Sequence, residues 1–550
     1  MKLVTIILIC SAAMGSLAAE RPNIVLIMTD DMGRETLGAH GGLDYKTPVL
    51  DQIGAEGLTF DHCYSLPICT PSRVKLMTGK YSFRNYVAFG QLDPSEKTFG
   101  NALQNAGYAT CIAGKWQLGG DHEQIKAFGW DEYILCNGVK PVDPKSKPLW
   151  QGKERYWFNS KVIADGAYYK TEQTYGPDMI SEYVTHYIKR ERDKPFFLYY
   201  PMILPHSPWA PTPHSKGGDK SGAKICEVQY FKDNIEYIDV LVGRVVQALE
   251  EAGIRENTII MFTGDNGSGY PVPVTASNPD LRRVGSVSGW GDYEEILLEP
   301  GDKSPTTMKK GRETVQEGPL TKTTYGDVPG RKNRMLRDGT GVPCVMDWPK
   351  YRDEYAKIGH RRDDLIDFSD FFATIMEVAE TSVDYPTDGV SFASRLRGEG
   401  AKKRKFVFCH YWRVGRDPKG ARDAIHDGNY KLYNDGTFYD LQTDSDELQP
   451  VDLKNAPEKA IAAHKQLWAQ YETVRGFAPD VAVAPSKLYD PSAPVAEGLS
   501  REEHMAKARK KKNFDEGRTT RWFNAKDLNN DNVIDAKEAK IKPPKDWNKK

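Results

Sequence analysis

The stretch NIVLIMTDDMG, residues 23–33, decides the fold. Its apolar residues run without alternation and end directly in two aspartates, followed shortly by a glycine. A strand of this kind is covered on both faces, which is typical of a parallel sheet. Two similar runs are PFFLYYPMILPHSPW at 195–209 and TIIMFTGDNGSG at 258–269.

Stretches with a helical pattern lie around these runs: 96–108, 229–252 and 364–380. The alternation of strands and helices predicts a doubly wound α/β domain. After about residue 400, short strands and turns at RKFVFCHYW, ARDAIHDGNYKLYN and GTFYDLQTD predict a smaller antiparallel subdomain. We therefore expect a large sheet flanked by helices and a small C-terminal sheet.

The N-terminus has the layout of a secretory signal peptide. Lys2 precedes an apolar run that ends in small residues near Ala18 and Ala19. This predicts a signal peptide at 1–19 and a secreted or periplasmic protein, although a plain hydrophobic terminus is the alternative. No later run is long enough to span a membrane. The net charge of -1 gives no reason to expect a nucleic acid partner.

The remaining chain divides by composition. We expect the α/β domain at 20–400, the antiparallel subdomain at 401–478, a Pro/Ala/Val-rich linker at 479–500 and a lysine-rich helical tail at 501–550. The eight cysteines have irregular spacing and no CxxC pair, so neither a zinc site nor a disulfide framework is predicted. Most should be buried as small apolar side chains.

Carboxylates follow two of the predicted buried strands. Asp30 and Asp31 end the first, and Asp265 and Asn266 end another. Adjacent aspartates after a strand can simply cap a helix. Because ligands in such sheets bind beyond the carboxyl ends of strands, the four side chains can also converge. Their oxygen atoms would suit Ca²⁺ or Mg²⁺ rather than zinc.

A single cysteine stands out in SLPICTPSRVKLMTGKY, residues 65–81. Cys69 comes just before Thr70 and Pro71, and proline favours the first turn of a helix. A group at that position meets free N–H donors and the positive end of the helix dipole. The residues alone leave two readings open, an activated thiol or a packed side chain.

CTPSR followed by LMTGKY resembles the signature of the type I sulfatases of the alkaline-phosphatase-like superfamily, and of secreted bacterial carbohydrate sulfatases in particular. The similarity extends from Asn23 to about Leu453 through GKWQLG, PHSPW, FTGDNG, GRKNRMLRDGTGVP, DGVSF and IHDGNYKLY. The resemblance implies that the large sheet flanked by helices is a mixed sheet. It also implies that a formylglycine-generating, sulfatase-maturating enzyme converts Cys69 to formylglycine.

The resemblance implies a role for each matching residue. Asp30, Asp31, Asp265 and Asn266 would hold Ca²⁺ beside formylglycine 69, whose hydrated form has one hydroxyl that attacks sulfur and a second that expels sulfate. Arg73 would hold this diol, and Lys115 and Lys332 would bind sulfate oxygens. His206 would be the general acid at the leaving oxygen.

Gln117 departs from the family pattern, which usually has histidine at this place. A carboxamide can hydrogen-bond a hydroxyl but cannot exchange protons with it. His122 is an alternative base, or the release of sulfate proceeds differently. For this reason a glycan-binding protein without catalysis stays open. A phosphomonoester or phosphonate ester hydrolase also stays open, because related enzymes of the same superfamily use the same fold and nucleophile.

Aromatic and basic side chains suggest a sulfated carbohydrate, such as a polysaccharide, as substrate. Trp209, His410 and Arg413 could contact sugar rings and further sulfates. Ordinary packing and solvated charge are the alternatives.

The tail contains a calcium-loop pattern, DLNNDNVIDAKE, at 527–538. Its spacing resembles an EF-hand loop and predicts a second Ca²⁺ site, with a solvated acidic loop as the alternative. The predicted ligands are Asp527, Asn529, Asp531, Val533, Asp535 and Glu538.

Overall fold

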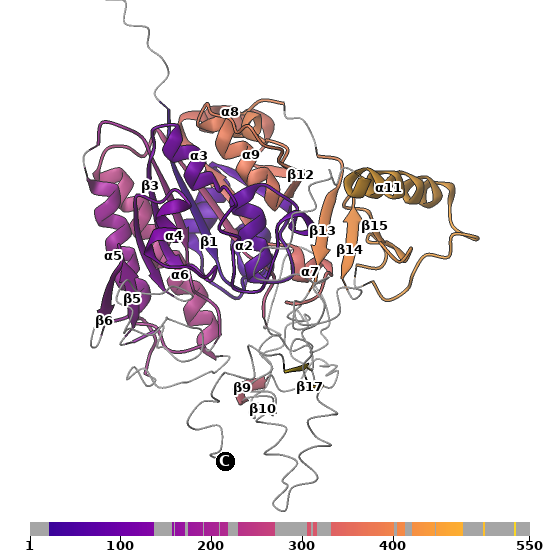
Figure 1. Ribbon diagram of the computed structural model, residues 1–550, viewed down its shortest axis with the longest axis horizontal. Coiled ribbons are helices and arrows are strands. Elements are labelled where there is room, and N and C mark those ends of the chain that lie inside the picture. The colour runs from indigo at the N-terminus through magenta and orange to yellow at the C-terminus, as the bar shows by residue number, and fades with distance from the viewer. Residues whose placement is uncertain are drawn as a thin grey trace, which may run out of the picture.

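The computed structural model (Figure 1) describes most of the predicted α/β domain and antiparallel subdomain. The described residues are 21–136, 157–158, 160–170, 174–190, 192–207, 209–217, 229–269, 332–400, 404–412, 421–445 and 447–476. Four further strands are described by their backbone alone: β9 (Pro305–Lys309), β10 (Arg312–Val315), β17 (Leu499–Ser500) and β18 (Val533–Ile534). The predicted signal peptide lies outside the described residues, as do the linker and tail apart from β17 and β18.

The α/β domain contains a ten-stranded mixed sheet, in the order β12-β2-β11-β8-β1-β7-β3-β4-β5-β6. Its strands are β1 (Asn23–Thr29), β2 (Leu58–Tyr64), β3 (Ala109–Lys115), β4 (Glu132–Cys136), β5 (Lys161–Ala164), β6 (Ala167–Lys170), β7 (Phe196–Pro201), β8 (Thr258–Gly264), β11 (Cys344–Asp347) and β12 (Arg361–Asp367). β1 pairs in parallel with both β7 and β8. The predicted α/β fold is thus confirmed, and the three apolar runs form its centre.

Helices cover both faces of this sheet, as the unbroken apolar run of β1 predicts. Val25 and Ile27 pack in the core beneath α1, α5 and α6, whereas Ile24, Leu26 and Met28 face α2, α3 and α9. Each fully buried aliphatic side chain contributes about 2 kcal/mol. The helices are α1 (Pro48–Glu56), α2 (Cys69–Thr78), α3 (Phe99–Asn105), α4 (His122–Ala127), α5 (Gly176–Lys189), α6 (Gln229–Glu251), α7 (Arg337–Thr340), α8 (Arg352–Ile358), α9 (Phe368–Val378) and α10 (Ala393–Leu396), with short 3-10 turns η1 (Arg34–Thr36), η2 (Gly38–His40), η3 (Ser82–Arg84) and η5 (Pro349–Tyr351).

One expected helix begins later than predicted. Residues 364–367 belong to β12, and α9 begins at Phe368. Asp367 ends the strand and caps the helix, because its side chain accepts a hydrogen bond from the backbone N–H of Ser369. The backbone N–H of Asp367 in turn donates to the carboxylate of Asp370, which completes a capping box.

The smaller subdomain, orange to gold in Figure 1, stands beside the α/β domain. Its antiparallel sheet consists of β13 (Val407–Tyr411), β14 (Arg422–His426), β15 (Tyr430–Tyr433) and β16 (Phe438–Asp440). Helix α11 (Glu458–Gly476) packs on this sheet through a core that includes Phe408, Ile425 and Leu467. The predicted antiparallel subdomain is confirmed.

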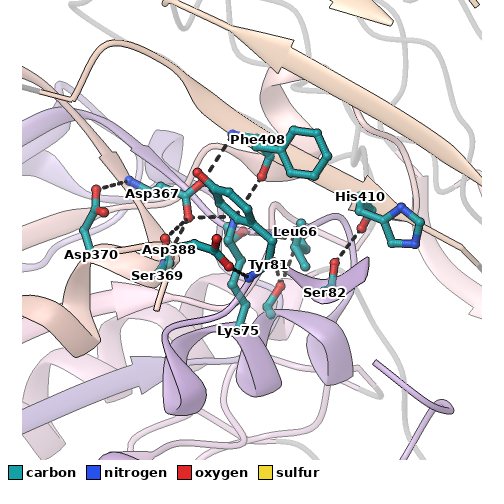
Figure 2. A network of polar contacts seen from close by, with 12 residues as sticks. Leu66, Lys75, Tyr81, Ser82, Asp367, Ser369, Asp370, Asp388, Phe408 and His410 are labelled. Carbon is teal, nitrogen blue, oxygen red and sulfur yellow. Dashed lines mark hydrogen bonds and ion pairs between the residues drawn. The ribbon is translucent and has the colours of Figure 1, made fainter. Parts of the chain in front are cut away.

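A buried polar network joins the two parts (Figure 2). Lys75 on α2 donates to Asp367 at 2.8 Å and to the carbonyl of Phe408 on β13 at 2.9 Å. Ser82, just after α2, donates to the carbonyl of His410 at 2.9 Å. The helix that begins at Cys69 is therefore fixed to both the α/β domain and the subdomain.

The described cysteines, Cys63, Cys69, Cys111, Cys136, Cys344 and Cys409, are all buried and free of disulfides. This agrees with their expected role as small apolar side chains. Among the described helices, none combines the length and apolar character needed to cross a membrane.

Candidate active site

The register of β1 and β8 brings the predicted carboxylates together. Thr29 is aligned with Gly264, so both strands end at the same level and Asp30 and Asp265 follow side by side. The backbone N–H of Asp31 donates to Oδ1 of Asp265 at 3.1 Å. Asp31 has a φ of 63°, a left-handed conformation that aspartate tolerates better than most residues.

Cys69 is the first residue of α2 and lies against these carboxylates. Its Sγ and one oxygen each of Asp30 and Asp265 are within 4.8 Å of one another. The turn before the helix is closed by Ser72, whose Oγ accepts a hydrogen bond from the N–H of Leu66 at 3.0 Å. Burial raises the pKa of the Cys69 thiol despite the nearby lysines.

Arg73, one turn further along α2, is buried and points at the same cluster. Its guanidinium donates to Oδ2 of Asp265 from Nε at 3.2 Å and from a terminal nitrogen at 2.8 Å, and to the carbonyl of Lys115 at 3.2 Å. These contacts fix the helix start relative to β8 and β3.

Two lysines complete the positive side of the site. Lys115 ends β3 and its ammonium group contacts Asp30. Gly114 before it has a φ of 132°, and a Cβ there would lie 2.0 Å from the carbonyl oxygen of Pro201. Lys332 donates to Asp31 at 2.7 Å, and its own backbone N–H donates to the carbonyl of Ser268 at 3.3 Å.

His206 follows β7 and faces the same carboxylates. Its Nε2 lies 3.6 Å from Oδ2 of Asp31, and its Nδ1 lies 2.5 Å from the carbonyl oxygen of Ser207. Burial, with Lys332 and Lys115 nearby, lowers the pKa of His206 to about 3, so the imidazole is neutral at neutral pH. Because Nδ1 donates to the carbonyl, neutral Nε2 is a proton acceptor.

The buried charges balance: three carboxylates meet three cations, Arg73, Lys115 and Lys332. Although burial opposes it, Lys332 and the other basic neighbours hold the pKa of Asp31 well below its usual range. Burial and the charge of Asp30 raise the pKa of Asp265 to about 6 in spite of Arg73.

Two buried oxygen atoms indicate that this cluster fits a cation. Asp30 Oδ1 and Asn266 Oδ1 have no hydrogen-bond partner among the described residues. Nδ2 of Asn266 donates to Asp31 Oδ1 and to the carbonyl of Gly267, both at 2.8 Å, which fixes its Oδ1 on the other side of the carboxamide. Carboxylate and carboxamide oxygens are hard ligands suited to Ca²⁺ or Mg²⁺.

Gln117, which departs from the family pattern, and His122, the alternative base, lie on different segments after β3. Gln117 is buried in the segment after β3 and has a φ of 55°. His122 lies on α4, and its Nδ1 is 2.8 Å from the hydroxyl of Tyr133 on β4. His206 is the imidazole that contacts the gathered carboxylates.

The two described side chains predicted to contact substrate differ in their burial. Trp209 is only 2% exposed, packs on Phe231 and donates to the carbonyl of Pro205 at 2.7 Å, which favours a packing role. His410 is half-buried, with its Nδ1 2.6 Å from Asp423. Arg413 lies outside the described residues, as does the calcium-loop pattern except for the backbone of β18.

A second layer of residues was not predicted from the sequence. Ser268 donates to Glu35 Oε1 at 2.6 Å and accepts from the N–H of Gly33 at 3.2 Å, which ties together the segments that follow β1 and β8. Burial raises the pKa of Glu35 to about 7. The position of Ser268, directly after the DNG motif, was the available signal.

Comparisons with known proteins agree with this geometry. Residues 22–381 match the sulfatase family model, and residues 331–475 match the model described as N-sulphoglucosamine sulphohydrolase, C-terminal. An N-acetylglucosamine-6-O-sulfatase of Bacteroides thetaiotaomicron is 30% identical over 506 residues, which cover 81% of this chain and 84% of that protein. The chain belongs to the sulfatase family, a class of sulfuric ester hydrolases of the alkaline-phosphatase-like superfamily.

Other relatives match a smaller part or only the fold. The N-acetylgalactosamine-6-sulfatase of Mus musculus is 31% identical over 291 residues, which cover 48% of this chain and 54% of that protein, so the chain spans about half the length of this relative. A solved structure in complex with its substrate D-glucosamine-2-N,6-O-disulfate has a TM-score of 0.59 at 19% identity and covers 84% of this chain and all of that one.

Proposed function

We propose that the protein hydrolyses sulfate esters of a sulfated carbohydrate, with Ca²⁺ in the carboxylate cluster and formylglycine made from Cys69. The convergence of the carboxylates, Asn266, three buried cations and His206 around Cys69 supports this proposal. Two of the sulfatases reported above are named for amino-sugar 6-sulfates, which favours a carbohydrate as substrate.

The residues proposed to hold Ca²⁺ are Asp30, Asp31, Asp265 and Asn266. Bound there, the dication would polarise the oxygen of the nucleophile and neutralise part of the carboxylate charge. The unpartnered oxygens of Asp30 and Asn266 would gain a ligand. The ammonium groups of Lys115 and Lys332 would then be able to contact sulfate oxygens.

Formylglycine at position 69 would supply an oxygen nucleophile together with a second hydroxyl for sulfate release. Arg73 is fixed by Asp265 and the carbonyl of Lys115, so its guanidinium stays beside the first turn of α2. Lys115 ends β3, and Lys332 lies in the segment before α7. Together these groups would stabilise negative charge that develops on the sulfate oxygens.

Proton transfer is assigned to His206. Its Nε2 is an acceptor in the neutral form, so the imidazole must first take up a proton before it can give one to the leaving oxygen. The negative charge of a bound sulfate ester favours that uptake. After donating, Nε2 can accept the proton whose removal sulfate release requires, a step that the carboxamide of Gln117 cannot perform.

The finer predictions for the ends of the chain are also retained as proposals. Residues 1–19 would direct export of the protein to the periplasm or medium, and a formylglycine-generating enzyme would modify Cys69. The calcium loop at 527–538 would bind a second Ca²⁺.

The test is sulfate release by protein whose Cys69 has been shown by peptide mass spectrometry to be formylglycine. N-acetylglucosamine 6-sulfate, N-acetylgalactosamine 6-sulfate and longer sulfated oligosaccharides are the substrates, with an aryl phosphate and an aryl sulfate compared in parallel. We expect sulfate release that requires Ca²⁺ and is lost in Cys69→Ala. A clear preference for the phosphate would favour the esterase alternative. Binding without release from any glycan would favour a protein that has lost catalysis.

A further inference from the structure

Two loops are tied to the residues on either side of Cys69. The N–H of Asn333 donates to the carbonyl of Pro67 at 2.8 Å, and the N–H of Gly90 donates to Oγ1 of Thr70 at 3.0 Å. Exposed side chains lie beside both tethers: Phe89 and Gln91 flank Gly90 in one loop, and Arg334 follows Asn333 in the other. Both loops are therefore fixed next to residues that flank Cys69 in the sequence.

Phe89 is an aromatic side chain with 46% of its surface exposed. Its loop is fixed directly after this residue, by the Gly90 contact to Thr70 and by the N–H of Leu92, which donates to the carbonyl of Leu118 at 3.0 Å. Since adjacent Cα atoms are about 3.8 Å apart, the backbone of Phe89 lies on the order of 10 Å from that of Cys69. An exposed ring on a fixed loop at this distance can contact the carbohydrate part of a bound sulfate ester.

Arg334 is an exposed cation two residues after Lys332. Within the described part of the chain it has no ion pair or hydrogen bond. Its loop is nevertheless fixed, because Asn333 accepts a hydrogen bond from the hydroxyl of Tyr411 on β13 at 3.2 Å and adopts a φ of 69°. The other cations of this region, Lys332 and Arg73, are buried and paired with carboxylates.

We propose that Phe89 and Arg334 are specificity-determining residues for a glycan that carries a second anionic group. The ring of Phe89 would stack on the apolar face of a sugar, and the guanidinium of Arg334 would bind a sulfate or carboxylate other than the one being hydrolysed. This inference rests on the proposed function. It deepens that function by restricting the substrate to polyanionic glycans.

The test compares wild-type kinetics on three groups of substrate. These are monosaccharides with one sulfate, glucosamine 2-N,6-O-disulfate as a doubly sulfated sugar, and unsaturated disaccharides that carry one sulfate and a uronate carboxylate. We expect kcat/KM for the best substrate with a second anion to exceed that for the best singly charged sugar by about fivefold or more. The second and third groups distinguish sulfate from carboxylate as the recognised anion.

Phe89→Ala should raise KM for every carbohydrate substrate by about fivefold, with kcat within about twofold of wild type. The inhibition constant of inorganic sulfate, which occupies only the sulfate-binding part of the site, should not change. Phe89→Trp should restore KM. Tyr169→Ala is the matched control, since Tyr169 is 51% exposed on the edge strand β6.

Arg334→Ala should abolish the preference for a second anion and leave singly sulfated sugars unaffected. It should also weaken the salt dependence of kcat/KM, because an exposed charge pair is screened by salt. Arg190→Ala, at the exposed end of α5, is the control.

Three results would overturn the inference: an unchanged KM in Phe89→Ala, an equal loss on all substrates in Arg334→Ala, or a wild-type enzyme indifferent to the second anion. A wild-type protein with confirmed formylglycine that releases sulfate from no sugar would instead contradict the proposed function.

Discussion

Helix α2 contacts two buried ionic clusters that differ in how completely their polar atoms are paired. The junction cluster consists of Lys75, Asp367, Asp370 and Arg404, and part of it is shown in Figure 2. The site cluster consists of Asp30, Asp31 and Asp265 with Arg73, Lys115 and Lys332. In the site cluster, one oxygen of Asp30 and one of the adjoining Asn266 have no hydrogen-bond partner among the described residues. The carboxylate oxygens of the junction cluster all have one.

This difference separates a structural role from a ligand-binding role. In the junction cluster, Lys75 contacts Asp367 and a carbonyl oxygen, and Arg404 donates to Asp370, Tyr81 and two carbonyl oxygens. Buried polar groups are normally paired, so full pairing indicates a rigid connection. Unpaired acceptors among carboxylates indicate a place for a cation.

The largest expected effect on stability comes from breaking the junction cluster. Lys75→Met leaves the buried carboxylate of Asp367 without its ammonium partner, so we expect unfolding free energy to fall by about 3–5 kcal/mol. Urea denaturation measures this. Lys75→Met combined with Asp367→Asn should recover part of the loss, since asparagine keeps an acceptor for Ser369 without the charge. Equal stability of wild type and the single variant would show that the cluster is not structural.

Glu35 is a buried acid near the site, and it has no basic partner in salt-bridge range among the described residues. Burial raises its pKa from 4.5 to about 7 in the folded protein. The folded state therefore binds the Glu35 proton more tightly than the unfolded state does. The free energy of unfolding consequently falls as pH rises from 4.5 to about 7 and this proton is lost.

Glu35→Gln, which keeps an acceptor for Ser268, should therefore be about 3 kcal/mol more stable than wild type above pH 7 and no more stable below pH 4.5. Thermal unfolding across this range measures the difference. Exposed Glu123→Gln is the control and should parallel wild type at every pH. A constant offset between Glu35→Gln and wild type would contradict the titration of Glu35.

Asn266→Ala tests the unpaired oxygens directly. Removing one ligand should lower activity at limiting Ca²⁺ by about 100-fold, and raising the Ca²⁺ concentration should recover part of it. Without Ca²⁺ the unfolding free energy should change by only about 1 kcal/mol, for the lost hydrogen bond to Asp31.

Asn234 provides a close control for this experiment. It is also a buried asparagine whose Nδ2 is hydrogen-bonded and whose Oδ1 has no described partner, but it lies on α6 beside Ala210 and Tyr230. Asn234→Ala should reduce stability without making activity depend more strongly on Ca²⁺. Equal behaviour of the two variants would remove the case for a cation at Asn266.

Much of the fold followed from local sequence patterns. The unbroken apolar run of β1 predicted a strand buried on both faces, and the aspartates that end β1 and β8 predicted where ligands would gather. These signals depend on consecutive residues. A local pattern does not show which segments pair in the fold. The helix predicted from Asp364 therefore began too early, because pairing with β2 extends strand β12 to Asp367.

What could not be predicted depends on contacts between distant segments. Trp209 looked like a sugar contact in the sequence, yet its indole packs in the core against Phe231. Glu35 reaches Ser268 only because β1 and β8 are adjacent. Phe89 and Arg334 became candidates only when their tethers to Thr70 and Pro67 were known.

The smallest expected effect concerns backbone strain at Gln117. Its φ of 55° is left-handed, which asparagine adopts more readily than glutamine, so Gln117→Asn should raise unfolding free energy by about 1 kcal/mol. The shorter side chain also withdraws the carboxamide, so sulfate release should slow. Glu380→Asn is the matched control: Glu380 has a φ of 53° in an exposed turn after α9, and this change should stabilise equally with activity unchanged. If Gln117→Asn gains stability without losing activity, neither the backbone strain at this position nor the reach of the glutamine carboxamide serves catalysis.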